Sequence, residues 1–218
     1  MLLSETRHDG FDLNYVTTIN IKDLTIQNAA NALILEYKNN ASDIEGIYTA
    51  ANITNVIFRN NTRAIENKKG RVELFNVLTE KSTVVANDIY NESEMTIVDS
   101  EINTLLTNAT NGILMLTSTG ADISTKAAEI ENLGTLTTEN TTEITKLTNS
   151  NKVNTLGTTT ITTLLNNASG TVTTSAQTTV TTFTNNGTLD ANGTTTISTL
   201  ANAGVVTTHD TNKFILLL

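Results

Sequence analysis

The chain has 218 residues, 38% of them hydrophobic and only 4% aromatic, with no Trp, no Pro and no Cys. So few aromatic rings would fill a wide globular core poorly, whereas a thin core of stacked aliphatic side chains needs few of them. The formal net charge of −9 argues against nucleic-acid binding, which depends on Lys and Arg. The absence of Cys excludes disulfides and thiolate ligands, and we expect no cofactor and no metal.

The N-terminal residues MLLSETRHDG have neither the basic nor the apolar region of a secretory signal. No run reaches the roughly 18 to 20 apolar residues of a membrane span, so we expect no membrane span. Residues 25–37 (TIQNAANALILEY) contain no Gly and predict a short capping helix, with a strand over residues 32–37 as the alternative. We therefore expect residues 1–45 to be an N-terminal cap or irregular first coils, followed by residues 46–218 as a repeat domain.

Six of the 13 basic residues fall within one short stretch. Five of them are candidates for a polyanion patch that binds sulfated surface glycans, the alternative being a solvated loop. These five are Arg59, Arg63, Lys68, Lys69 and Arg71.

Candidate catalytic residues are few. The only histidines, His8 and His209, lie near the two ends, so a Ser/His/Asp triad is not expected. Acid and base side chains at Lys81, Asp88, Asp99 and Glu101 are the best alternative, and they would mark a carbohydrate-binding or carbohydrate-cleaving groove within residues 59–101. Solvated charge explains them more simply, and we expect no enzyme and no catalytic residue.

A repeat occupies residues 125–210. Its first apolar position is separated by 17, 17, 19 and 17 residues, at Ala127, Ile144, Ile161, Val180 and Ile197. A second apolar residue follows three positions later and an Asn five positions later. The consensus is T-x-[IVA]-x-x-[LIF]-x-N-x-G-x-[LV], closed by a small residue.

The repeat predicts an all-β fold, a right-handed parallel β-helix, or β-solenoid, with coils of about 17 residues. Alternation with a period of two marks strands, and the three-residue step between the two apolar positions requires a corner. Stacked coils place like residues above one another, so we expect a structural Asn ladder along the axis, with Gly or Asn providing positive φ at corners. The ladder residues are Asn132, Asn149, Asn166, Asn185 and Asn202.

Threonine pairs flank the inward apolar residues, as in Thr160-x-Thr162, Thr179-x-Thr181 and Thr196-x-Ser198. Their side chains should point outward in two parallel columns, an arrangement that resembles the flat arrays of ice-binding solenoids. The preceding coils carry Glu143 and Lys126 in the same columns, which interrupts the array. Ordinary exposed β-branched faces are the alternative.

The C-terminus is apolar, and we expect it to be either a final strand or an assembly end for self-association, end to end or lateral. Its residues are Phe214, Ile215, Leu216, Leu217 and Leu218.

Residues 125–210 resemble the β-helical repeats of bacterial surface adhesins, namely the filamentous-haemagglutinin-like exoproteins and autotransporter passengers, through recurrent N-x-G-x-[LVI] phrases. The resemblance implies a structural or adhesive protein at an extracellular or cell-surface location, on a cell or virion, that builds fibres through its ends. Carbohydrate binding or cleavage is the alternative function, and ice binding is the third.

Overall fold

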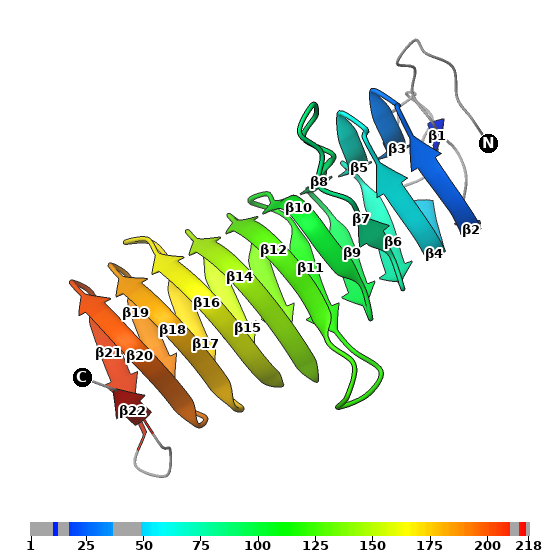
Figure 1. Ribbon diagram of the computed structural model, residues 1–218. Coiled ribbons are helices and arrows are strands. Elements are labelled where there is room, and N and C mark those ends of the chain that lie inside the picture. Colours follow the sequence, from blue (N-terminus) through cyan, green and yellow to red (C-terminus); the bar gives the residue numbers. More distant parts are fainter. Residues whose placement is uncertain (1–10, 13–17, 37–48, 210–213, 217–218) are drawn as a thin grey trace.

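The computed structural model describes residues 11–12, 18–36, 49–209 and 214–216 of the chain, and side chains only for residues 18–36 and 50–209. All regular structure in these segments is β, and every pair of adjacent strands is parallel. The strands stack into one elongated β-solenoid, with β1 near one end and β22 at the other (Figure 1). The predicted fold class is confirmed.

Each turn of the solenoid has three faces. Face A is built by the first halves of β2 (Thr18–Gln27) and β4 (Thr49–Arg59) and by β6 (Gly70–Phe75), β9 (Glu94–Val98), β11 (Ile113–Thr117), β13 (Thr135–Thr138), β15 (Lys152–Thr155), β17 (Thr171–Thr174), β19 (Thr188–Ala191) and β21 (Val205–Thr208).

Face B is built by the second halves of β2 and β4, by β7 (Leu78–Thr79) and β22 (Phe214–Leu216), and by the first halves of β10 (Glu101–Asn108), β12 (Thr125–Asn132), β14 (Thr141–Asn149), β16 (Thr158–Asn166), β18 (Thr178–Asn185) and β20 (Thr195–Asn202). Face C is built by β1 (Phe11–Asp12), β3 (Asn31–Leu35), β5 (Arg63–Asn67), β8 (Asp88–Asn91) and the second halves of those six long strands.

The corner between faces B and C is where the alternation of side chains breaks. In β14 the side chains of Ile144 and Leu147 are buried, and the two residues between them, Thr145 and Lys146, both point outward. Two consecutive outward residues turn the strand without ending its ladder. The predicted corner therefore lies at the three-residue step, inside one continuous long strand.

The stacking register reproduces the predicted coil length. Ile130 pairs with Leu147, Leu147 with Leu164, Leu164 with Phe183 and Phe183 with Leu200, which gives steps of 17, 17, 19 and 17 residues. Over the whole molecule a turn averages about 19 residues. The average is longer because turns before residue 125 carry loops at their corners, such as the loop between β7 and β8.

The predicted capping helix over residues 25–37 is wrong for the part of that segment which the structure describes. Residues there belong to β2 and β3, which pair in parallel with β4 and β5. Leu33 and Leu35 are fully buried in the stack. Helix propensity is a weak preference, and stacking against an existing strand overrides it. The alternative strand over residues 32–37 corresponds to β3 within the described residues.

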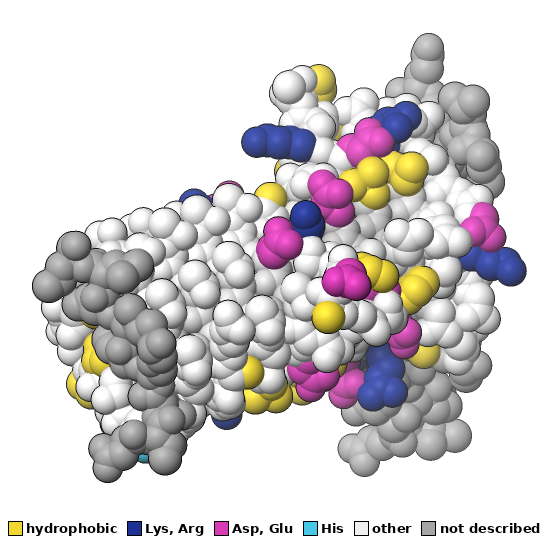
Figure 2. All heavy atoms as spheres, turned by 60° about the horizontal axis from the view of Figure 1, so that its bottom comes forward, with side chains coloured by type: hydrophobic (Ala, Val, Ile, Leu, Met, Phe, Trp, Pro, Cys, Tyr) yellow, Lys and Arg dark blue, Asp and Glu magenta, His cyan; other side chains and the backbone are white. Residues whose placement is uncertain are grey.

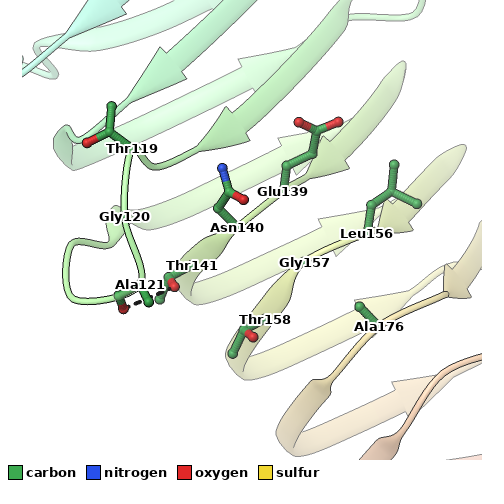
Figure 3. A pocket seen from close by; sticks show the side chains of 10 residues that line it. All are labelled: Thr119, Gly120, Ala121, Glu139, Asn140, Thr141, Leu156, Gly157, Thr158 and Ala176. Carbon is green, nitrogen blue, oxygen red and sulfur yellow. Dashed lines mark hydrogen bonds between the residues drawn. The ribbon is translucent and has the colours of Figure 1, made fainter.

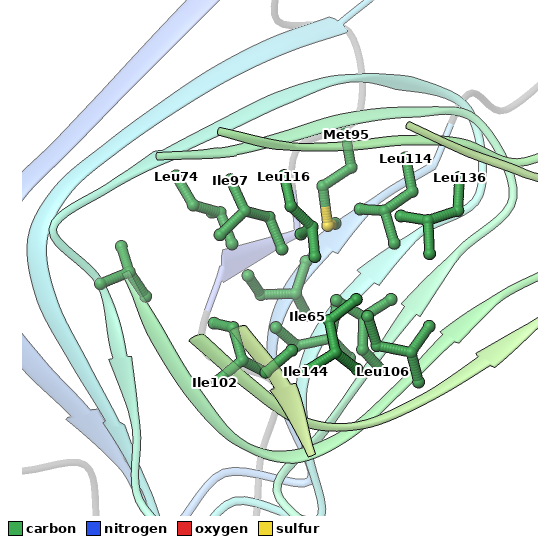
Figure 4. Packing of buried hydrophobic residues seen from close by; sticks show 14 of the residues in the cluster. Ile65, Leu74, Met95, Ile97, Ile102, Leu106, Leu114, Leu116, Leu136 and Ile144 are labelled. Carbon is green, nitrogen blue, oxygen red and sulfur yellow. The ribbon is translucent and has the colours of Figure 1, made fainter. Parts of the chain in front are cut away.

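The core is a set of aliphatic columns that run along the axis (Figure 4). On face A, Leu74 pairs with Ile97 and Ile97 with Leu116, and each of these side chains is fully buried. Burying one such side chain contributes about 1.5 to 3 kcal/mol. The core is thin, so aliphatic side chains fill it, and among the side chains that the structure describes only Phe58 and Phe183 bring rings into it.

Glycine at the corner between faces C and A is required for close stacking and not, as expected, for positive φ. A Cβ atom on Gly187 would overlap the carbonyl oxygen of Gly170 in the preceding turn, and neither glycine has φ in the left-handed region. Positive φ instead occurs at Asn and Asp of the other two corners, including Asn55, Asn76 and Asn140.

Candidate functional site

The most regular polar feature of the solenoid is a ladder of asparagine side chains at the end of face C, which is buried except at Asn202. In it, the Nδ2 atom of Asn132 donates to Oδ1 of Asn149, and that of Asn149 donates to Oδ1 of Asn166, each at 2.8 Å. The same bond joins Asn166 to Asn185 and Asn185 to Asn202, also at 2.8 Å. The five asparagines predicted from the repeat thus form one hydrogen-bonded chain.

The ladder continues toward the N-terminus through three residues that the sequence reasoning missed. Asn67 donates to Asn91, Asn91 to Asn108 and Asn108 to Asn132, at 2.8 to 2.9 Å. All three side chains are fully buried. The signal was present as an [IL]-x-N triplet at the end of each strand, but irregular loops between these strands hid the spacing.

The ladder ends at Asn67 because the preceding turn places Leu35 in the same column. The Oδ1 atom of Asn67 is consequently buried without a hydrogen-bond partner. Each Nδ2 atom also donates to backbone carbonyls of the neighbouring corner, as Asn132 does to Gly134 and Lys152. The ladder therefore fixes both the stacking of turns and the geometry of the corner.

The five residues of the predicted polyanion patch lie on different sides of the solenoid. Arg59 ends the face B portion of β4, Arg63 lies on face C, Lys68 and Lys69 lie at the corner between C and A, and Arg71 lies on face A. Four of them are in ion pairs: Arg59 with Glu80, Arg63 with Glu66 and Asp88, Lys68 with Glu36 and Glu66, and Arg71 with Glu94. Two hydrogen bonds from the Arg59 guanidinium to Glu80, both 2.6 Å long, lower the pKa of that carboxyl. The positive charge of these four basic side chains is therefore largely compensated by the carboxylates beside them.

The candidate acids and base are also separated. Asp88 lies on face C beside Arg63, whereas Asp99 lies at the corner between A and B and accepts hydrogen bonds from Thr119. Glu101 lies on face B and accepts from Asn103. The structure does not bring these carboxylates together into one groove.

Two loops overhang shallow grooves instead. The loop of residues 118–124, between β11 and β12, covers one end of a groove of about 540 Å³ along the corner between A and B (Figure 3). Its floor is Asn140, Gly157 and Ala176 from successive turns, and its walls include Glu139 and the half-exposed Leu156. Thr141 Oγ1 donates to the carbonyl of Ala121 at 3.3 Å and holds the loop.

The second groove, of about 400 Å³, lies under the loop of residues 80–87 at the corner between B and C. Its polar lining includes Lys81, Asn103 and the ion pair of Lys146 with Glu129, whose atoms lie 2.6 Å apart. The groove thus combines both signs of charge, and three of these four polar residues lie beyond the predicted 59–101 region.

The C-terminal end of the stack is less covered than its interior. Leu200 and Val206 are partly exposed, whereas their counterparts in the turn before, Phe183 and Leu189, are 1% exposed. Phe214, Ile215 and Leu216 of the predicted assembly end form β22, which pairs with β20 on face B. Their side chains, with Leu217 and Leu218, lie outside the described residues.

In the part of the chain that the structure describes, no cluster of three or more His, Cys, Asp or Glu residues could hold a metal ion. The same part contains no helix long and apolar enough to cross a membrane. No protein-family model, curated protein or solved structure matches this chain.

Proposed function

We propose that the chain is a structural or adhesive rod exposed on the surface of a cell or virion. The observation that carries this proposal is the asparagine ladder, which runs without interruption through eight turns beside a continuous aliphatic core. The interior side chains thus hold the stacked turns together, and the side chains that a partner could contact lie on the three outer faces. No catalytic step and no cofactor are part of the proposal.

A rod of this kind suits display, because each turn depends mainly on its two neighbours. Length is gained by adding turns at about 4.8 Å each without enlarging the core. The resemblance of residues 125–210 to bacterial adhesin repeats supports the same role, and it is the reason for placing the protein outside the cell.

Localisation tests the proposal most simply. Antibodies raised against residues 125–209 should label intact cells or virions of the source, and external protease should remove that label. Labelling that appears only after permeabilisation would contradict a surface role.

We also propose that the rod associates with a second copy through its C-terminal end. Backbone groups of β21 (Val205–Thr208) have a parallel neighbour on one side only among the described residues, and Val206 beside them is partly exposed. An open strand edge of this kind is a template for further pairing.

Sedimentation velocity over a range of concentrations tests this association. The unmodified chain should form concentration-dependent oligomers, and Val206→Lys should abolish them because it places a charge in the apolar column. Val205→Lys is the matched control, since that side chain is 58% exposed on the outer surface of the same strand. A monomer at all concentrations, or equal loss in both variants, would contradict association through this end.

A further inference from the structure

The outer surface of the solenoid changes character along its axis. Between residues 153 and 209 the only ionisable side chains are Asp190 and His209, which pair with each other at 2.8 Å. Charged side chains gather over the other half of the rod in the view of Figure 2, while the C-terminal half is almost entirely uncharged. The last turns therefore present a neutral surface.

On face B this neutral surface is a grid of nine side chains, eight of which carry a hydroxyl group, and we call it the threonine face. Its three rows, one per turn, are Thr158, Thr160 and Thr162, then Gln177, Thr179 and Thr181, then Thr194, Thr196 and Ser198. The central column is in register, because Thr160 pairs with Thr179 and Thr179 with Thr196. The grid spacing is about 4.8 Å between rows and about 6.7 Å between alternate residues in a row.

The outward hydroxyls differ from the inward ones in their hydrogen bonding. The inward Thr159, Thr178 and Thr195 each bond to a threonine hydroxyl of face A, at 2.6 to 2.7 Å. In the described chain, none of the hydroxyls of the threonine face has a hydrogen-bond partner, so all of them are available to water. Each can donate one hydrogen bond and accept two.

The grid is also rigid. β-Branched Thr side chains are restricted at χ1, and the backbone of each row is held by parallel pairing with the neighbouring turns. Consequently, little further conformational entropy is lost when the hydroxyls and methyl groups meet an ordered partner. The rows repeat at the spacing of the strands, so a partner that contacts all three rows at once must itself be extended and periodic.

We propose that the threonine face binds the surface of ice. Ice is a rigid, neutral lattice of water molecules that both donate and accept hydrogen bonds, which matches a neutral grid of unpartnered hydroxyls. A crystalline polysaccharide is the other periodic partner, but between residues 153 and 209 the single aromatic side chain is Phe183, and it is buried. None of the nine residues of the threonine face is therefore an aromatic platform on which a sugar ring could stack. This activity is independent of the rod's location and of its end-to-end association.

The test is thermal hysteresis and ice-crystal shape measured on the full chain. The unmodified protein should hold the freezing point below the melting point and produce faceted crystals. Thr179→Lys, at the centre of the grid, should remove both effects. Thr173→Lys is the matched control, because Thr173 is a half-buried outward residue of face A that also lies between two buried neighbours, Val172 and Thr174. It should leave both effects intact.

Circular dichroism establishes that both variants keep their strand content. Round crystals and no hysteresis with the unmodified chain would overturn the proposal. Equal loss in both variants, or none in either, would also overturn it, because the threonine face would then not be the binding surface. Binding to crystalline cellulose or chitin that disappears in Thr179→Lys, without hysteresis in the unmodified chain, would replace ice with a polysaccharide.

Discussion

An asparagine in the ladder meets three demands with one short side chain. At Asn149, Oδ1 accepts from Asn132 in the turn before, while Nδ2 donates to Asn166 in the turn after and to the carbonyl of Asn151 at the corner. Aspartate lacks the donor and leucine lacks both groups. Because buried amides are costly when unpaired, each member of the ladder depends on its neighbours.

Truncation of a central ladder residue should therefore be strongly destabilising. We expect Asn149→Ala to lower the free energy of unfolding by about 2 to 4 kcal/mol, since it leaves buried groups of Asn132 and Asn166 without their partner. Asn154→Ala, on the outer side of β15, should change it by less than about 0.5 kcal/mol. Urea denaturation of both variants measures the difference, and equal stabilities would show that the ladder does not hold the turns together.

A second prediction at the residue scale concerns the glycine at the corner between faces C and A. Gly187→Ala should destabilise the fold by about 1 to 3 kcal/mol, because the added methyl group overlaps the backbone of the preceding turn. Gly120→Ala is the control, since nothing lies within 4 Å of its Cβ position. The two midpoints of thermal unfolding should differ clearly, and a stable Gly187→Ala variant would mean that the turns stack less closely than described.

At the scale of elements, a polar contact on the outer surface adds to the ladder and the strand pairing that join the last described turn to the one before it. His209 follows β21, and its Nε2 lies 2.8 Å from Oδ1 of Asp190 in β19. Hydrogen bonds from His209 and then from Asn192 lower the pKa of Asp190 below its ordinary value of 3.8. The folded carboxyl therefore binds its proton less readily than the unfolded one.

This shift gives the last turn a defined pH dependence. A lowered pKa contributes stability that is present above the unfolded value of 3.8 and is lost as the pH falls through the folded value. Hydrogen-exchange protection of the amides in β21 should accordingly decrease through that acidic range. In Asp190→Asn the hydrogen-exchange protection of β21 should be lower at neutral pH and change little on acidification. If the protection in the unmodified chain does not change on acidification, the contact between His209 and Asp190 does not stabilise the last turn.

Sequence patterns predicted the elements well where the repeat is regular. Uniform spacing after residue 125 revealed the strands, the corner inside each long strand and five ladder positions. Before that point the loops between β7 and β8 and between β11 and β12 change the length of each turn, so Asn67, Asn91 and Asn108 could not be aligned by spacing. The helix expected over residues 25–37 failed for a related reason, because only the pairing of β3 with β5 shows that this segment is part of the stack.

The polar surface was harder still to predict, because closeness in sequence is not closeness on a solenoid. The basic residues at positions 59, 63 and 71 follow the chain round the turn and so lie on three different faces. Conversely, Glu129 and Lys146 are 17 residues apart and in contact. Only the register of stacked turns decides which charges meet.

At the scale of the whole molecule, one continuous ladder joins eight stacked turns. Solution NMR can observe it directly, because scalar coupling across a hydrogen bond links the Nδ2 atom of one asparagine to the Cγ atom of the next. We expect an unbroken series of such couplings from Asn67 to Asn202, in which the donating side-chain amides, Asn67 to Asn185, exchange their protons slowly with solvent. Rapid exchange of these protons, or couplings confined to isolated pairs, would contradict it.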